Sequence, residues 1–213
     1  QSFIPSGEMG AQLQAVYRDD WQVNWYLGQT IQSLHYAEPS STASEDGHEL
    51  IATLASGETV EADIWLSALG LQANIGLAKH SGLQVNQGIV VDQYQRTSAD
   101  DIYAIGDCAE LGGRLRQYVA PILHSCRALA KTLTGHLTEV VYPPMPVQIK
   151  TTQCSVVSYI PEIIDEHAQW RVTGEAQHKQ ALLMCSDQLH GFVLMGDAVS
   201  SKMNLLKELS PSM

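Results

Sequence analysis

The stretch Thr97–Glu110, TSADDIYAIGDCAE, decides how the rest of this sequence is interpreted. Its residues 101–105, DIYAI, are mostly apolar, which predicts a short buried strand. Gly106 and Asp107 follow where that strand should end. A glycine lets the backbone approach a ligand closely, and an ionised carboxylate only accepts hydrogen bonds. This pair therefore suits a ligand that carries several hydroxyl groups.

A second glycine-aspartate pair in the same chain shows how little the dipeptide alone implies. The string 192–198, FVLMGDA, also places the pair after an apolar run. The residues 199–209 that follow have a helical pattern, so Asp197 is interpreted as the N-cap of that helix. Asp107 has a similar alternative, a simple turn residue, and only the longer string around it favours a ligand.

That longer string resembles the flavin-binding signature of the FAD-dependent pyridine-nucleotide-disulfide oxidoreductase superfamily. The matching residues are Thr97, Ile102, Tyr103, Ala104, Gly106 and Asp107. The continuation through Cys108–Glu110 and through 130–135, AKTLTG, is most similar to the rubredoxin–NAD reductase branch. The resemblance implies that Asp107 holds the ribityl chain of FAD and that the next helix begins beside the flavin ring.

The string 117–122, QYVAPI, leads into that helix. Proline is tolerated in a first helical turn, and the N-terminus of a helix is partly positive. With the resemblance, we expect Ala120, Pro121 and Ile122 to face the part of the flavin where negative charge collects on reduction. Without it, a plain helix start would be the better interpretation.

The string 62–70, ADIWLSALG, predicts a strand that runs into a glycine. It resembles an Ala-x-Gly string with which the superfamily closes its pyridine-nucleotide domain, and this implies that Ala68 and Gly70 lie near the cofactor. An ordinary glycine turn is the alternative. The residues after it, Leu71–Ala73, depart from the proline and basic residue that the superfamily often has there.

Four basic residues follow the flavin-like string within 18 positions: Arg114, Arg116, Arg127 and Lys131. The resemblance implies a small iron–sulfur carrier of the rubredoxin type as partner, and such carriers are generally acidic. Because this chain has a net charge of −11 and only 12 Lys and Arg, docking would need a local positive rim. A solvated helix face is the alternative interpretation of the same residues.

Composition limits the class of protein and the kinds of partner that this chain can have. A chain of 213 residues with 45% hydrophobic residues is expected to be globular, and its negative charge disfavours nucleic acid and anionic membranes as partners. No apolar run reaches membrane-spanning length. The cysteines (Cys108, Cys126, Cys154, Cys185) and the eight histidines lack paired ligand spacing, so we predict no metal site and free thiols in a reducing cytoplasm.

The predicted fold class is α/β, with partial FAD/NAD(P)-binding, Rossmann-like domains followed by a small α+β C-terminal module. The predicted domains are 1–70, the end of an NAD(P)-binding domain, 71–140, the returning segment of an FAD-binding domain, and 141–213, the module after the linker YPPMP at 142–146. Strands are expected at 21–27, 31–36, 49–54, 58–61, 62–70, 88–92, 101–105, 147–149, 170–174, 181–185 and 192–195, and helices at 9–17, 75–83, 119–133 and 199–209.

The sequence contains no GxGxxG string, the phosphate-binding signature of such domains. We therefore expect the chain to be the C-terminal half of a flavoenzyme whose N-terminal half is its partner, to bind FAD weakly or not at all alone, and to self-associate through exposed apolar surface. The reaction that the resemblance implies is electron transfer from NAD(P)H through FAD to a rubredoxin-like carrier. A non-catalytic, acidic α/β interaction module is the alternative.

Overall fold

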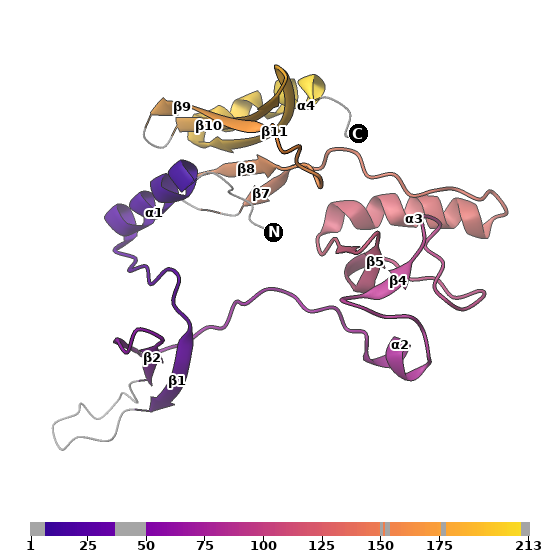
Figure 1. Cartoon of the computed structure of the whole chain (residues 1–213), viewed down its shortest axis with the longest axis horizontal. Helices are drawn as coiled ribbons and strands as arrows, with labels where there is room; N and C mark the ends of the chain where they lie inside the picture. Colours follow the sequence, from indigo (N-terminus) through magenta and orange to yellow (C-terminus); the bar gives the residue numbers. More distant parts are fainter. Residues whose placement is uncertain (1–6, 37–49, 150, 152–153, 176–177, 210–213) are drawn as a thin grey trace. The chain divides into compact units, whose positions relative to one another are not determined.

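A computed structural model of the chain describes residues 7–36, 50–149, 151, 154–175 and 178–209 (Figure 1). The chain divides into two compact units. One consists of Gln1–Val16 with Leu71–Met213, and the other of Tyr17–Gly70. No helix in the described ranges is long and apolar enough to cross a membrane.

The Tyr17–Gly70 unit is built on a three-stranded antiparallel sheet. Its strands β1 (Ile31–Tyr36), β2 (Leu50–Leu54) and β3 (Thr59–Ala62) are paired in that order. The predicted strand at 31–36 and the predicted hairpin at 49–61 are therefore confirmed. Every residue of β1 is exposed, whereas Ala52 and Leu54 of β2 are buried.

Two strands predicted for this unit are wrong. The residues 22–27 are irregular because Gln22 has a φ of 58° and the Val23 N–H donates to the Tyr17 carbonyl at 3.2 Å. The alternation of aromatic residues there reflects edge contacts with Tyr17 instead, with ring centroids 5.8 Å away for Trp21 and 6.2 Å for Trp25.

The second wrong strand is the predicted 62–70. Only Ala62 belongs to a strand, and 63–70 pairs with no described strand. The indole Nε1 of Trp65 instead donates to the Leu50 carbonyl, at 3.5 Å.

The larger unit contains a five-stranded antiparallel sheet. Its strands are β7 (Val147–Ile149), β8 (Val156–Tyr159), β9 (Gln169–Glu175), β10 (His178–Cys185) and β11 (Gln188–Met195), in the order β7-β8-β11-β10-β9. The sheet is followed by a 3₁₀ helix η2 (Gly196–Ser201) and by α4 (Lys202–Glu208). The sequence predicted β7, β9, β10, β11 and a closing helix at 199–209, but not β8, a short internal strand, or the 3₁₀ helix that begins at Gly196.

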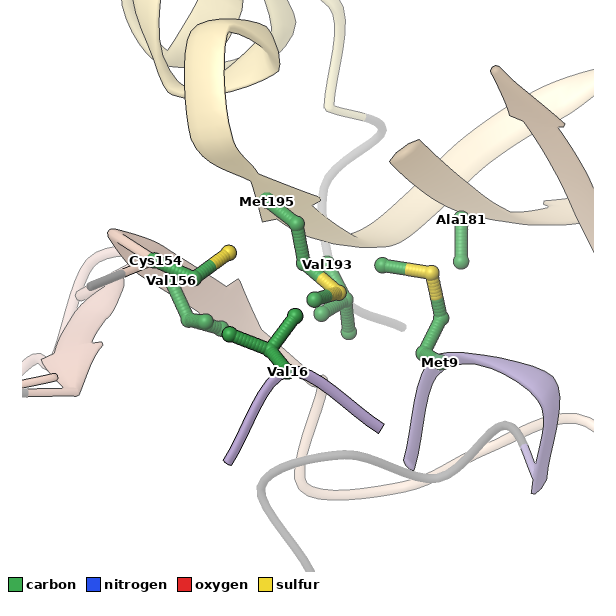
Figure 2. Packing of buried hydrophobic residues seen from close by; sticks show 7 residues of the cluster. All are labelled: Met9, Val16, Cys154, Val156, Ala181, Val193 and Met195. Carbon is green, nitrogen blue, oxygen red and sulfur yellow. The ribbon is translucent and has the colours of Figure 1, made fainter. Parts of the chain in front are cut away.

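The two faces of this sheet carry two cores. Alternate strand residues point to opposite faces, and on one face Val156, Val193 and Met195 pack against Met9 and Val16 of α1 (Gly7–Trp21). Figure 2 shows these side chains pointing toward one another between helix and sheet. On the other face, Phe192, Leu194 and Val157 pack against Leu205 of α4. The predicted helical face at 9–17 is thus confirmed.

The rest of the unit surrounds a smaller sheet, in which β4 (Ile89–Val91) runs parallel to β5 (Ala109–Leu111) and β5 pairs with β6 (Arg114–Leu115). Helix α2 (Gly76–His80) precedes it, and α3 (Val119–Leu133) follows. Helix α3 ends as predicted, at Gly135 with φ 89°: the N–H groups of Gly135 and His136 return to the carbonyls of Thr132 and Lys131.

The strand predicted at 101–105 does not form. Only Tyr103 makes an isolated bridge, with Arg96, and Asp101 has a φ of 61°. The segment's hydrogen bonds run back to residues 95–99, as in the bond from the Ala104 N–H to the Gln95 carbonyl at 3.2 Å. A segment bonded in this way, within one local turn, builds no regular ladder.

Candidate functional site

The turn at Gly106 begins the candidate site. Ile105 before it is extended, with φ −140° and ψ 164°, and Gly106 has a φ of 77° and opens a 3₁₀ helix η1 (Gly106–Cys108). This left-handed conformation favours glycine. A Cβ at position 106 would lie 3.8 Å from Cγ1 of Ile122, so the glycine faces the first turns of α3.

Asp107 is exposed at this turn. Its backbone carbonyl accepts a hydrogen bond from Nε2 of Gln117 at 3.3 Å. Its carboxylate has no hydrogen-bond or ion-pair partner among the described residues, so both of its oxygens are available to hydroxyl donors.

The start of α3 leaves backbone donors available. Tyr118 is the extended N-cap residue, and its own N–H donates to the Arg116 carbonyl at 3.0 Å. Helix geometry gives the N–H groups of Val119 and Ala120 no partner inside the helix, Pro121 has none to offer, and no side-chain cap bond is made. Burial raises the pKa of the Tyr118 phenol.

A small cavity gathers three of the predicted cofactor residues. Gly106, Pro121 and Ile122 line it together, and the sequence reasoning missed most of its other walls. Those walls are Val91, Gln95, Ala104, Ala109, Leu111, Arg116, Ser125 and Tyr142. The Ser125 and Tyr142 hydroxyls are 2.9 Å apart, which ties α3 to the segment that follows it.

A buried carboxylate holds the sheet under this site. Glu110 is 3% exposed, and it accepts hydrogen bonds from the Gly88 N–H at 2.8 Å and from Nδ2 of Asn86 at 2.9 Å. A Cβ at Gly88 would come within 2.6 Å of Cδ2 of Leu115, so only glycine fits there. Glu110 is the last residue of the flavin-like string, but nothing in the sequence predicts that its side chain turns inward.

The four predicted partner-binding residues fall into two pairs. Arg114 and Arg116 both approach Glu162, at 3.9 Å and 2.5 Å. Arg127 and Lys131 lie one turn apart on α3, are exposed, and have no ion pair with a described residue.

Ala68 and Gly70 belong to the Tyr17–Gly70 unit. Both are exposed in an irregular segment, and Gly70 has a φ of 97°. Their contact with a cofactor stays a prediction. Asp197, by contrast, is not the N-cap that the sequence predicted: its carboxylate lies 3.2 Å from Nδ1 of His178, and no side-chain bond caps η2.

Two known families match this chain. Residues 6–126 match the family described as pyridine nucleotide-disulphide oxidoreductase. Residues 139–209 match the family described as rubredoxin binding C-terminal domain. The first match covers more than half of the chain and includes both Gly106–Asp107 and the start of α3.

Curated relatives agree with these matches. The chain is 44% identical over 191 residues to a rubredoxin-NAD(+) reductase from Alcanivorax borkumensis, covering 89% of this chain and 48% of the relative. It is 37% identical over 161 residues to a nitric oxide reductase FlRd-NAD(+) reductase from Escherichia coli, covering 75% and 42%. The chain therefore spans about half the length of the curated relatives it matches.

Solved structures show the same fold. A ferredoxin reductase from Rhodopseudomonas palustris matches with a TM-score of 0.75 at 19% identity, over 97% of this chain and 51% of that one. A persulfide reductase from A. fulgidus matches with a TM-score of 0.74 at 20% identity, over 96% and 41%. The predicted α/β fold class, with FAD/NAD(P)-binding-type domains, is confirmed, and the chain belongs to the pyridine nucleotide-disulphide oxidoreductase family.

Proposed function

We propose that this chain supplies the flavin-facing and carrier-facing parts of an FAD-dependent oxidoreductase, which passes electrons from NAD(P)H to a small iron–sulfur carrier such as rubredoxin. The observation that carries the proposal is the free carboxylate of Asp107 at a glycine turn beside the start of α3. The match of residues 139–209 to rubredoxin-binding domains supports the choice of carrier.

The residues at this turn fit the flavin end of FAD. Asp107 would accept hydrogen bonds from ribityl hydroxyls, and Gly106 would let the chain approach without a side chain in between. The N–H groups of Val119 and Ala120 would point toward the electron-rich edge of the ring, with Pro121 and Ile122 supporting that turn. FAD, when bound, takes up a hydride from the reduced nicotinamide and releases its electrons one at a time.

We assign the rest of the chain from its resemblance to the same family. Residues 1–70 are the end of the NAD(P)-binding domain, with Ala68 and Gly70 near the cofactor; 71–140 are the returning segment of the FAD domain; and 141–213 are the carrier-binding module. We place the protein in the cytoplasm, because its four cysteines, all of which lie in the described segments, form no disulfide.

We assign docking of the carrier to the basic residues that follow the turn at Gly106–Cys108, which we call the flavin turn. Arg127 and Lys131 present unpaired positive charge on one face of α3, which suits an acidic partner. Arg114 and Arg116 lie nearby in sequence, but Glu162 neutralises much of their charge.

The test uses the full product of the gene that encodes this chain. It should carry FAD when purified, its flavin absorption should bleach anaerobically with NADH or NADPH, and oxidised rubredoxin should then restore that absorption. Replacing Lys131 with Gln should raise the KM for rubredoxin and flatten its dependence on salt, while a small neutral acceptor is reduced at the wild-type rate. A colourless protein that binds neither nucleotide would overturn the proposal in favour of a non-catalytic interaction module.

A further inference from the structure

Among the described basic side chains that follow Gly106–Cys108, Arg116 has the most partners within the protein. It is only 14% exposed, its Nε donates to Oε1 of Glu162 at 2.8 Å, and its Nη2 lies 2.5 Å from the same oxygen. Its Nη1 donates to the Leu111 carbonyl at 3.4 Å, and its guanidinium lies over the Tyr142 ring, 4.5 Å from the centroid. All three nitrogens of the guanidinium and one of its faces are thus in contact with other parts of the protein.

These contacts join three parts of the larger unit. Arg116 directly follows β6, and β5 and β6 connect it to the flavin turn. Tyr142 belongs to the linker and hydrogen-bonds Ser125 of α3, which is 4% exposed. Glu162 lies in the connection between β8 and β9, within residues 139–209 that match the rubredoxin-binding domain. One guanidinium therefore connects the flavin turn, α3 through the linker, and the carrier-binding module.

The chemistry of the contact favours positioning over docking. A guanidinium presents its donors in a rigid planar fork, and two nitrogens of Arg116 approach one oxygen of Glu162, which holds that oxygen between them. Glu162 also cancels the charge that an acidic carrier would need to find there. Domains joined by a short linker otherwise move relative to one another unless a large apolar interface holds them.

We propose that Arg116 and Glu162 form a latch that fixes the carrier-binding module relative to the flavin turn, and so sets the distance over which electrons pass to the docked carrier. Arg116 is in this sense a positioning residue, and the latch rests on the proposed function above. Arg127 and Lys131, which have no such contacts, attract the carrier. Arg116 thus orients the carrier-binding module, and Arg127 and Lys131 attract the carrier.

The experiment separates these two roles in the full gene product. Glu162→Gln keeps the shape of the side chain and removes its charge, and Arg116→Lys keeps the charge and removes the fork. Asp187→Asn is the matched control, because it breaks an exposed pair with Arg171 in the same module, 3.1 Å apart. For each variant, kcat and KM with rubredoxin are measured across salt concentrations. Amide hydrogen exchange of the linker is read at Val140, whose N–H donates to the Gln93 carbonyl at 2.9 Å, and at Tyr142 and Met145, because the prolines between them have no N–H.

Both latch variants should lower kcat at saturating rubredoxin by about three- to tenfold and speed exchange in the linker. KM and its salt dependence should stay unchanged in Arg116→Lys, and KM should not rise in Glu162→Gln, which leaves Arg114 and Arg116 without their carboxylate partner. The control should match wild type in every measurement. Wild-type kcat and linker exchange in Glu162→Gln would overturn the latch. So would a raised KM with unchanged exchange, since it would make Glu162 and its arginines a docking surface.

Failure of the latch is distinguishable from failure of the proposed function. If the wild-type protein does not reduce rubredoxin at all, the function is wrong, and the exchange measurement alone decides the latch. Faster exchange in both latch variants would then support it, and unchanged exchange would overturn it.

Discussion

The turns at Gly106 and at Gly196 begin in the same way. Each glycine has a positive φ, 77° and 58°, follows an extended residue and opens a 3₁₀ helix in which an aspartate comes second. What precedes them differs: the irregular segment 101–105 leads to Gly106, and the buried strand β11 leads to Gly196.

The two aspartates differ even more in their partners. Asp197 pairs with His178 of the neighbouring strand, and its backbone N–H lies 3.2 Å from the same ring nitrogen. Asp107 has no such neighbour within the described parts of the chain, and the start of α3 lies beside its glycine. The same local backbone thus places the Asp197 carboxylate against a neighbouring strand of the sheet, and leaves the Asp107 carboxylate without a partner among the described residues. The surroundings, and not the dipeptide, carry the functional meaning.

The largest expected effect is on the free energy of unfolding, and it concerns β11, the strand before the turn at Gly196. Phe192 is fully buried in β11, so Phe192→Ala should lower the free energy of unfolding by about 3–5 kcal/mol. The matched change before the first turn, Ile105→Ala, removes a half-buried side chain and should cost about 1 kcal/mol. Urea unfolding of the two variants measures the difference. Equal losses would mean that segment 101–105 is packed as firmly as β11.

The next effect concerns the aspartates themselves. Asp107→Ala should weaken FAD binding to the full gene product by about 1–3 kcal/mol, because ribityl hydroxyls would lose a charged acceptor. Asp197→Ala is the control and should leave FAD affinity unchanged, since its carboxylate serves His178. Fluorescence titration of the apoprotein with FAD compares the two. Equal FAD affinity in both variants would reduce Asp107 to a turn residue.

The smallest effect comes from a third positive-φ turn, which contains no glycine. Ser186 and Asp187 join β10 to β11 with φ values of 47° and 62°, the geometry of a two-residue type I′ turn. Asn adopts this conformation more readily than Ser, so Ser186→Asn should stabilise the chain by about 0.5 kcal/mol or less. Thermal unfolding measures it. A loss of stability would show that Ser186 has a role beyond turn geometry.

Elements with a long or repeated pattern could be predicted from the sequence. The apolar face of α3 and the glycine that ends it were both readable, as were the hairpin at β2–β3 and four of the five strands in the larger sheet. Short apolar stretches were less reliable, because whether 21–27 or 101–105 becomes a strand depends on finding a partner strand. The candidate site follows the same rule.

Gly106, Pro121 and Ile122 were predicted because a family string carries them, and the structure brings them to one cavity. Tyr142, Ser125 and Glu162 were not, since each acts through a contact with a residue distant in sequence, and no local pattern records such contacts.

The hydrogen bond from the Gly88 N–H to the Glu110 carboxylate limits which substitutions this sequence can accept during evolution. A Cβ at position 88 would meet Leu115 at 2.6 Å and the Cys108 carbonyl at 2.8 Å, so that position accepts no replacement while β4 and β5 keep their register. Losing the Glu110 carboxylate would leave the buried Gly88 N–H without its acceptor and would release the Asn86 side chain. Natural variation should therefore spare Gly88 and Glu110, which support the turn at Gly106 from beneath, while the exposed residues of that turn can change.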